Sequence, residues 1–216
     1  MPPGFEPKSG SVSPKHPIFR PDAISAAAGQ FARRGVAVLG PPALPADLHT
    51  ALTAEARTQH ATQSWALTGT RARGEIEQSN RRAYLGPIAR GFLGSDEIAT
   101  FLHAATGRAL APSWSATCYT HYRGPGEHVG EHCDKADACA VALLVYLEAV
   151  WPGPSPGPGL QLFVFQGDNS STGLAAVVTT HGNRCVVLDG AKQAHLRPPL
   201  APGESMLMLA GCFRAA

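Results

Sequence analysis

Residues 117–134 have the sequence TCYTHYRGPGEHVGEHCD, in which two strand-like runs flank a turn rich in Gly and Pro. The turn contains Gly124, Pro125 and Gly126, and Gly130 follows in the second run. Glycine and proline disfavour a helix, and short runs of β-branched and aromatic residues around such a turn are typical of strands. The stretch therefore predicts β-structure, with His132 and Asp134 on one strand.

The same texture continues to the C-terminus. Short apolar or β-branched runs, separated by Gly/Pro turns, cover residues 117–122, 140–147, 160–165, 175–180, 184–188, 195–200 and 205–213. About seven or eight short strands in this arrangement predict an antiparallel sandwich or barrel, and a jelly roll meets that description. Residues 151–159 read WPGPSPGPG and are expected to form a loop that can be shortened without loss of the fold.

Helical signals dominate the first half of the chain. Capping Asp or Ser residues, spaced Ala and Leu residues and terminal glycines predict helices at residues 22–34, 44–60 and 95–107, with a short strand at 36–39. We therefore expect a mainly β protein with N-terminal helices, an α+β arrangement. It would comprise a flexible arm at residues 1–20 and a single domain at 21–216, with helical support at 21–110 and the β core at 111–216.

Composition narrows the class of protein. The net charge of +2 over 216 residues, without a run of Lys or Arg, argues against binding to nucleic acid or to a membrane surface. The sequence contains no apolar stretch of membrane-spanning length, and its start lacks the layout of a signal peptide, so we expect a cytoplasmic protein. Five cysteines without a C-x-x-C pair are expected to be reduced residues in or near the core.

An imidazole and a carboxylate lie two residues apart at His132 and Asp134. In a strand, side chains at i and i+2 point to the same face, so both groups would face one space while Cys133 turns away. With His195 they would form the 2-His-1-carboxylate set of non-haem iron(II) oxygenases, which leaves metal positions open. His128 is excluded as a fourth ligand, because on a strand it lies about 13 Å from His132.

The context of these three residues resembles the prolyl-4-hydroxylase-like family of iron(II)/2-oxoglutarate-dependent dioxygenases. Similar motifs follow in order at residues 119–134, 145–147 (VYL), 159–162 (GLQL), 184–189 (RCVVLD) and 198–204, so the resemblance covers residues 112–214. It implies a double-stranded β-helix of eight strands, with His132 and Asp134 on the second and His195 on the seventh. It also implies Fe(II), 2-oxoglutarate and O2 as cofactor and cosubstrates. Hydroxylation is favoured over halogenation, because the family's halogenases lack the carboxylate that Asp134 supplies.

One position departs from this family. Its members usually carry an Arg or Lys about ten residues after the distal histidine to pair with the 5-carboxylate of 2-oxoglutarate, but this chain has Ser205 there. Arg197 should share the inward face of His195, and we prefer it to Arg214 as the replacement cation.

Two tyrosines precede the His-x-Asp pair. Tyr119 and Tyr122 are both candidates for a hydrogen bond from a phenol to the cosubstrate, by resemblance to the tyrosine that the family carries before this pair. Each is equally well interpreted as a half-buried aromatic residue of the barrel.

We therefore expect an oxygenase that hydroxylates or otherwise oxidises a small molecule, such as an amino acid or a secondary-metabolite intermediate, as a monomer or homodimer. An iron(II)/O2 oxidase that does not use 2-oxoglutarate, a peptidyl hydroxylase and a jelly-roll protein with a structural or sensory metal are the alternatives. Trp65, Arg71, Arg73 and Glu75 lie in a segment that would form either a substrate lid or a plain surface loop.

Overall fold

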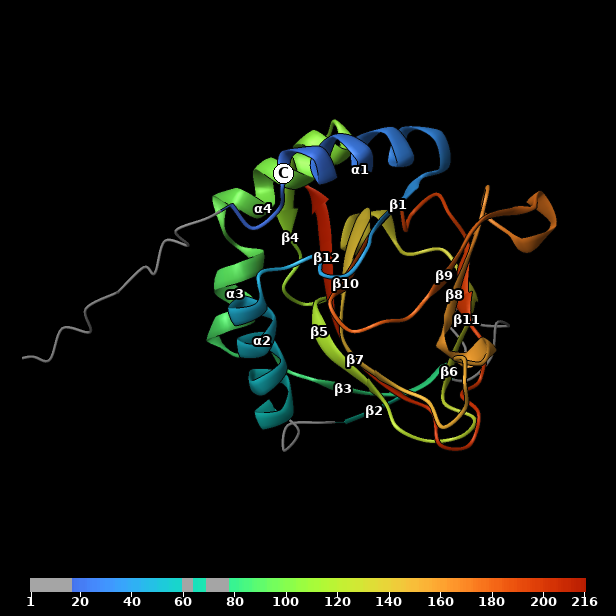
Figure 1. Cartoon of the computed structure of the whole chain (residues 1–216). Coiled ribbons are helices and arrows are strands. Elements are labelled where there is room, and N and C mark those ends of the chain that lie inside the picture. The colour runs from blue at the N-terminus through green and yellow to red at the C-terminus, as the bar shows by residue number, and fades with distance from the viewer. Residues whose placement is uncertain (1–16, 60–63, 69–77) are drawn as a thin grey trace, which may run out of the picture.

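The computed structural model describes residues 17–59, 64–68 and 78–216, with side chains described outside 64–68. Strands dominate it and belong to one antiparallel sheet (Figure 1). The strands are β1 (Val36–Leu39), β2 (Ser64–Thr68), β3 (Gln78–Ala83), β4 (Leu110–Pro112), β5 (Cys118–Tyr122), β6 (His128–His132), β7 (Val141–Val150), β8 (Gln161–Phe165), β9 (Leu174–Thr179), β10 (Arg184–Leu188), β11 (His195–Arg197) and β12 (Ser205–Ala215).

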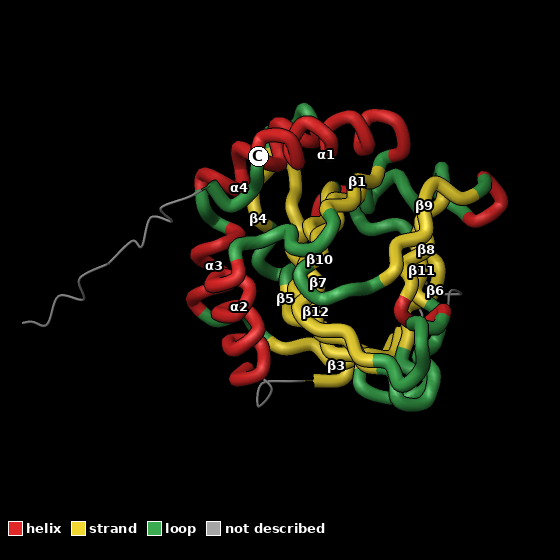
Figure 2. Tube along the Cα trace, in the orientation of Figure 1, coloured by secondary structure: helices red, strands yellow, loops and turns green. Residues whose placement is uncertain are grey.

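The sheet curls into a nearly closed barrel. Neighbouring strands of the sheet are hydrogen-bonded in the order β1-β10-β7-β12-β5-β3-β6-β11-β8-β9. In addition, β2 pairs with β3, and β4 pairs with β12. In Figure 2 the strands β6, β8, β9 and β11 face β5, β7, β10 and β12 across the barrel. The eight strands from β5 onward are those of a jelly roll, so the predicted fold class is confirmed.

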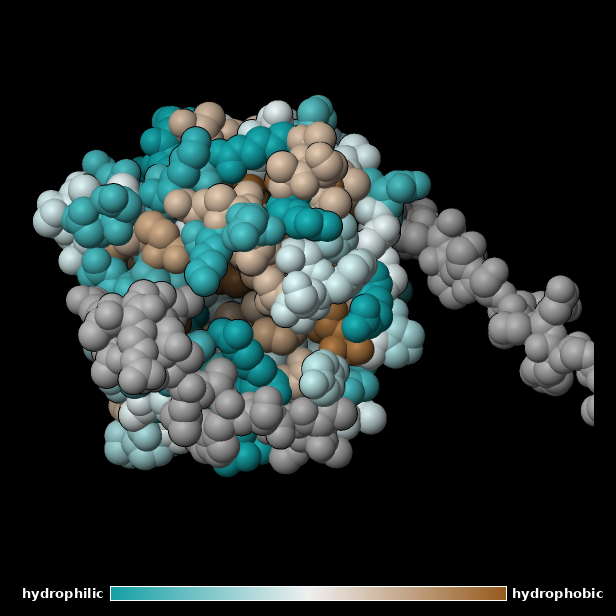
Figure 3. Space-filling view, turned by 180° about the vertical axis from the view of Figure 1, so that it is seen from behind, coloured by the Kyte–Doolittle hydropathy of each residue, from teal (hydrophilic) through white to brown (hydrophobic). Residues whose placement is uncertain are grey.

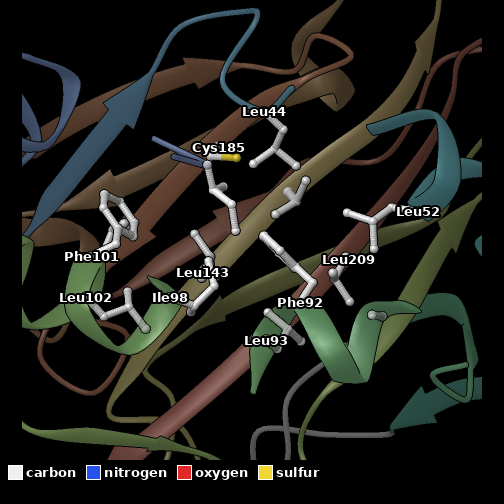
Figure 4. Packing of buried hydrophobic residues seen from close by; sticks show 14 of the residues in the cluster. Leu44, Leu52, Phe92, Leu93, Ile98, Phe101, Leu102, Leu143, Cys185 and Leu209 are labelled. Atoms are coloured by element: carbon white, nitrogen blue, oxygen red, sulfur yellow. The ribbon is translucent and has the colours of Figure 1, made fainter. Parts of the chain in front are cut away.

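Alternation along the strands separates two hydrophobic clusters. On β12, Leu207 and Leu209 belong to the cluster beneath the helices, while Met206 and Met208 belong to the cluster inside the barrel. Figure 4 shows the first cluster, in which residues of helices and of strands, such as Phe92 and Leu143, interleave. Residues of β12 on the same face as Met206, at every second position, therefore point into the barrel interior.

Five α-helices are described: α1 (Pro21–Arg34), α2 (Ala46–Thr58), α3 (Pro87–Leu93), α4 (Asp96–Thr106) and α5 (Ala136–Cys139), with short 3-10 turns at Pro158–Leu160 and Ser170–Thr172. The first four lie on the outer side of the sheet, where α1 packs on α4 and α2 on β7 (Figure 1). The helices predicted at residues 22–34, 44–60 and 95–107 and the strand at 36–39 are confirmed, with shifts of one or two residues at their ends.

The first turn of α3 is held by a carboxylate from another helix. Glu55 accepts hydrogen bonds from the backbone N–H groups of Ile88 (2.6 Å) and Ala89 (2.9 Å) and from the hydroxyl of Tyr119 (2.7 Å). An acidic side chain at a helix N-terminus satisfies donors that have no partner within the helix. Helix α3 is absent from the sequence-based expectations, although Pro87 in its first turn and Gly94 after its last turn are typical of helix ends.

Two expectations about the N-terminal arm and the cysteines need correction. Residues 1–16 lie outside the described residues, but Ile18 and Phe19 are buried, and Phe19 stacks on Phe101 with ring centroids 4.0 Å apart.

Cys139 and Cys212 form a disulfide, so the prediction of five reduced cysteines is wrong for these two. Helix α5 packs against β12 and brings together two residues that are 73 positions apart, a proximity that spacing does not reveal.

The loop between β7 and β8 is more firmly attached than its composition predicts. The backbone N–H of Gly157 donates to the carboxylate of Glu204 (2.7 Å), and a Cβ added at Gly159 would lie 2.6 Å from the carbonyl oxygen of Pro199. The prediction that the loop can be shortened is therefore restricted to residues 151–156, because the last three residues are packed. Sequence alone showed only that Pro and Gly prevent a regular element here.

The surface mixes hydrophilic and hydrophobic residues on the face opposite to that of Figure 1 (Figure 3). The large hydrophobic side chains that are exposed include Tyr84 and Trp114 in loops and Val177 on β9. None of the helices in the described ranges combines the length and the apolar character needed to span a membrane.

Candidate metal centre

Two neighbouring strands place the histidines side by side. His132 is the last residue of β6 and His195 the first of β11, and the two are register partners in the antiparallel pair. Directly opposite residues point to the same face of a sheet. The two imidazole rings accordingly lie with centroids 4.2 Å apart. The pairing of the strands, and not the linear spacing of the residues, brings the ligands together.

Asp134 follows β6 by two residues and is anchored from behind. Its backbone N–H donates to the carbonyl of Gly190 (2.8 Å), and a Cβ at Gly190 would collide with the Asp134 carboxylate. Oδ1 of Asp134 lies 3.6 Å from Nε2 of His132, and Oδ2 lies 4.0 Å from Nε2 of His195. One ligand atom from each residue lies within 4.8 Å of the others, which is the arrangement of a three-ligand facial site.

Hydrogen bonds select the ligand atom of each histidine. Nδ1 of His132 lies 2.9 Å from the carbonyl oxygen of Gly130, and Nδ1 of His195 lies 3.0 Å from that of Gln193. Because a carbonyl oxygen only accepts, Nδ1 carries the proton in both rings and Nε2 keeps its lone pair. This is the orientation by backbone groups that metal-binding histidines commonly show.

The electrostatic state of the three residues suits a cation. Burial and the nearby charge of His132 lower the pKa of His195 to about 4, so this ring is neutral near pH 7. Burial alone would raise the pKa of Asp134, but its neighbours His132, His195 and Arg82 lower it below its ordinary value. An ionised carboxylate and a neutral imidazole, with Nε2 of His132 beside them, are suitable ligands for a divalent metal.

Arg197 is buried inside the barrel on the same face as His195. It is 2% exposed, and its guanidinium donates to the hydroxyls of Tyr146 (2.8 Å) and Thr180 (3.0 Å) and to the carbonyl of Gly159 (3.3 Å). Within the described residues it has no carboxylate partner. A buried charge without a counter-ion is costly, so this environment favours an anionic ligand.

Arg197 and His195 lie two residues apart on β11, and both side chains are buried. A dicarboxylate such as 2-oxoglutarate would meet the guanidinium with one end while its other end reaches the metal position. The chemistry of these donors therefore fits both iron(II) and 2-oxoglutarate.

The two tyrosines predicted to bind the cosubstrate lie on opposite faces of the sheet, because side chains alternate along a strand. Tyr122 faces the barrel interior with the guanidinium carbon of Arg197 5.8 Å from its ring centroid, and burial raises its pKa to about 12. Tyr119, three residues earlier on β5, belongs to the cluster beneath the helices and bonds Glu55. The structure thus places Tyr119 on the opposite face of the sheet from the metal ligands, against its assignment to the cosubstrate.

Ser205 and Arg214 also lie away from the triad. Ser205 opens β12 one residue before the inward Met206, so it faces outward, beside Glu148 in a small surface cavity of about 150 Å³. Arg214 is exposed near the far end of β12, opposite Ala111. Of the two arginines considered, only Arg197 points into the barrel.

Sequence reasoning missed several polar residues of the interior. Tyr146 and Thr180 hold Arg197, and Gln78, Asn80 and Arg82 occupy alternate positions of β3, which lies between β5 and β6. Alternation within the strand around residue 145 could have identified Tyr146. No hydrophobic alternation marked β3, because its inward residues are polar. Of the proposed lid, Arg71, Arg73 and Glu75 lie outside the described residues, as does the side chain of Trp65.

Comparison with solved structures gives several similar proteins. A prolyl-4-hydroxylase from Pseudomonas putida is 22% identical, with a TM-score of 0.63 over 89% of this chain and 99% of that one. The α-ketoglutarate-dependent epimerase SnoN from nogalamycin biosynthesis is 16% identical, with a TM-score of 0.69 over 91% and 82%. HygX from Streptomyces hygroscopicus, solved with nickel and 2-oxoglutarate, is 14% identical, with a TM-score of 0.58 over 86% and 85%.

At the level of sequence, neither a family model nor a curated protein matches the chain. The solved structures resemble it over most of their lengths and of its own, at identities too low to carry a function. The chain has the jelly-roll fold that these enzymes share.

Proposed function

We propose that this chain is an iron(II)- and 2-oxoglutarate-dependent oxygenase that oxidises a small molecule. The observation that carries the proposal is the buried, carboxylate-free Arg197 two residues from His195, one of three ligands with metal-site geometry. A structural metal site would need a closed ligand set, whereas three protein ligands leave positions open. The solved proteins of similar fold support the same chemistry, since several carry 2-oxoglutarate.

Each residue of the site has a distinct task in this proposal. His132, Asp134 and His195 would hold the metal through Nε2 and carboxylate oxygens. Bound iron(II) and 2-oxoglutarate would supply O2 activation coupled to decarboxylation of 2-oxoglutarate to succinate. Arg197 would fix the distal carboxylate in a desolvated contact, with the hydroxyls of Tyr146 and Thr180 holding the guanidinium in place.

Tyr122 would contribute as a neutral donor. Burial keeps its hydroxyl protonated at neutral pH, with a pKa of about 12, although the charges of Arg197 and Arg82 act in the opposite direction. A phenol that stays protonated donates a hydrogen bond to an anionic ligand without adding negative charge. The small-molecule part of the proposal is supported by SnoN and by HygX, which has been solved with hygromycin B.

The proposal is tested by iron-dependent conversion of 2-oxoglutarate to succinate in aerated buffer, with His132→Ala as the control. We expect slow succinate formation by the wild-type protein even without its substrate, and none by the variant, whose fold is checked by circular dichroism. If iron-loaded protein forms no succinate but consumes O2 with added metabolites, it is an oxidase that does not use 2-oxoglutarate. Succinate formation by His132→Ala equal to that of the wild type would remove His132 from the site.

A further inference from the structure

Strand β3 presents a row of polar side chains to the barrel interior. Ala83 belongs to the cluster beneath the helices, so by alternation Gln78, Asn80 and Arg82 face the other way, toward Tyr122. A contact supports this orientation, because the amide nitrogen of Asn80 lies 3.5 Å from the Tyr122 hydroxyl. Gln78 and Asn80 are buried and Arg82 is exposed, so this polar row does not serve the hydrophobic core.

The hydrogen bonds of this row fix the direction of each amide. A guanidinium only donates, and Nη2 of Arg82 lies 2.8 Å from Oε1 of Gln78, so the oxygen of Gln78 faces Arg82. The same oxygen lies 3.4 Å from the amide group of Asn80, which must therefore turn its nitrogen toward it. The oxygen of Asn80 has no hydrogen-bond partner among the residues that the structure describes, and Asn80 is only 1% exposed.

An unpartnered buried oxygen calls for a donor. 2-Oxoglutarate cannot supply one, since its two carboxylates and its keto group only accept at neutral pH. Water or an N–H or O–H group of another molecule in the barrel would supply this donor, and a substrate that enters the barrel would take the place of the water. Leaving such an oxygen unsatisfied costs about 1–3 kcal/mol, which binding of that molecule would recover.

Arg82 adds a charge to this argument. Among the described residues it bonds only the neutral Gln78 and has no carboxylate within ion-pair distance. The opposite charges of bound iron(II) and 2-oxoglutarate would cancel, and Arg197 would cancel Asp134. Arg82, which is exposed, would remain as a cation without an acidic partner among the described residues.

We propose that β3 is the substrate-recognition strand, and that the substrate is a small carboxylate bearing a hydroxyl or amino group. Arg82 takes the carboxylate, and the oxygen of Asn80 accepts a hydrogen bond from the hydroxyl or amino group. The inference rests on the proposed function, because it assigns the metal and Arg197 to the cosubstrate. The guanidinium of Arg82 and the amide of Asn80 both lie beside Oε1 of Gln78, so one small molecule can meet the two groups at different points of its structure.

The test uses the full chain loaded anaerobically with Mn(II) and saturating 2-oxoglutarate, and measures paramagnetic broadening of probe proton signals. Matched probes separate the two contacts: lactate, L-alanine and L-proline against their amides for the charge, and lactate against propionate for the donor. We expect the wild-type protein to prefer each acid to its amide and lactate to propionate. Arg82→Leu should weaken binding of the acids roughly tenfold, and Asn80→Leu should abolish the preference for lactate.

Arg214→Leu is the matched control, since it removes an exposed arginine far from β3, and the fold of each variant is checked by circular dichroism. Equal broadening of acids and amides by the wild-type protein, or unchanged preferences in both β3 variants, would overturn the proposal. So would a loss of 2-oxoglutarate affinity in Arg82→Leu, which would make Arg82 the cosubstrate anchor. Failure of the wild-type protein to bind 2-oxoglutarate at all would instead overturn the proposed function.

Discussion

Among single residues, Arg197 gives the strongest indication of a site for an anionic ligand. A guanidinium can lie in a protein interior only if its donors are satisfied and its charge is matched. Three hydrogen bonds to neutral groups meet part of the first requirement, and rings of Tyr122 and Tyr146 lie 5.8 and 5.5 Å from its carbon. The second requirement is left to a ligand, which is why this residue distinguishes a cosubstrate site from a plain core.

Substitution of Arg197 should weaken cosubstrate binding and little else. We expect Arg197→Leu to lower the affinity for 2-oxoglutarate by about 1.5–3 kcal/mol, roughly ten- to a hundredfold, because a charge-assisted contact is lost. Arg214→Leu should leave it unchanged. The dissociation constants can be measured by isothermal titration calorimetry on Mn(II)-loaded protein. Equal affinities in the wild type and Arg197→Leu would remove this residue from the cosubstrate site.

The buried His195 predicts how stability depends on pH when no metal is bound. Its pKa falls from 6.5 to about 4 on folding, so between these pH values the unfolded chain binds a proton that the folded protein does not. The free energy of unfolding should therefore decrease as the pH falls from about 6.5 to about 4, by about 3 kcal/mol. Urea titrations of metal-free wild type and His195→Gln would show a shallower dependence in the variant. Identical slopes would contradict the assignment.

Among the elements, the β7–β8 loop connects the fold to Arg197 and thus to the proposed cosubstrate site. Gly159 is in contact with the backbone of residues 199 and 200, and its carbonyl accepts from Arg197 (3.3 Å). A Cβ there would lie 2.6 Å from Pro199 O and Leu200 Cα, backbone atoms that cannot rotate away. The loop therefore has a free part and a fixed part, although Pro and Gly occur throughout.

This division predicts opposite outcomes for two glycines of one loop. Gly159→Ala should destabilise the protein by about 1–3 kcal/mol through overpacking, and should also weaken 2-oxoglutarate binding. Gly153→Ala is the matched control, since the nearest atom to its added Cβ is Ser155 O at 3.8 Å. Thermal unfolding of the two variants provides the comparison. A melting temperature of Gly159→Ala equal to that of Gly153→Ala would show that the backbone yields at this point.

The alternation of side chains along a strand explains which site residues could be predicted from the sequence. His132 and Asp134 share a parity and were found together, as were His195 and Arg197. Tyr119 and Tyr122 differ in parity, so one strand could never have pointed both inward, and register was needed to say which one does. The row on β3 was missed for another reason. Its pattern is polar on the inward face, and hydrophobic alternation is the signal by which strands are recognised.

For the molecule as a whole, short runs and turns were sufficient to predict a jelly roll, because each strand of its second half carries its own local signal. Contacts between distant segments were not predictable in this way. Glu55 reaches α3 and Tyr119 from α2, and Cys139 meets Cys212 across 73 residues. Such pairs depend on the complete packing of helices on the sheet, which no local pattern encodes.

The disulfide gives a prediction for the whole chain. Denatured protein that has not been reduced should show three reactive thiols, from Cys118, Cys133 and Cys185, and five after reduction. Reduction should lower the free energy of unfolding by about 2–4 kcal/mol, since the link closes a long loop between α5 and β12. Thiol titration and denaturant unfolding with and without reductant provide both values. Five thiols in freshly purified, unreduced protein would contradict the link.

The central claim is that one barrel interior holds iron(II) at the triad and 2-oxoglutarate between the triad and Arg197. Its most direct test is the visible absorption of anaerobic, iron(II)-loaded protein during titration with 2-oxoglutarate. We predict a weak charge-transfer band that saturates with the ligand, is absent in Asp134→Ala, and needs higher 2-oxoglutarate concentrations in Arg197→Leu. Wild-type protein that has bound iron, as verified by metal analysis, and develops no band at saturating 2-oxoglutarate would contradict the account.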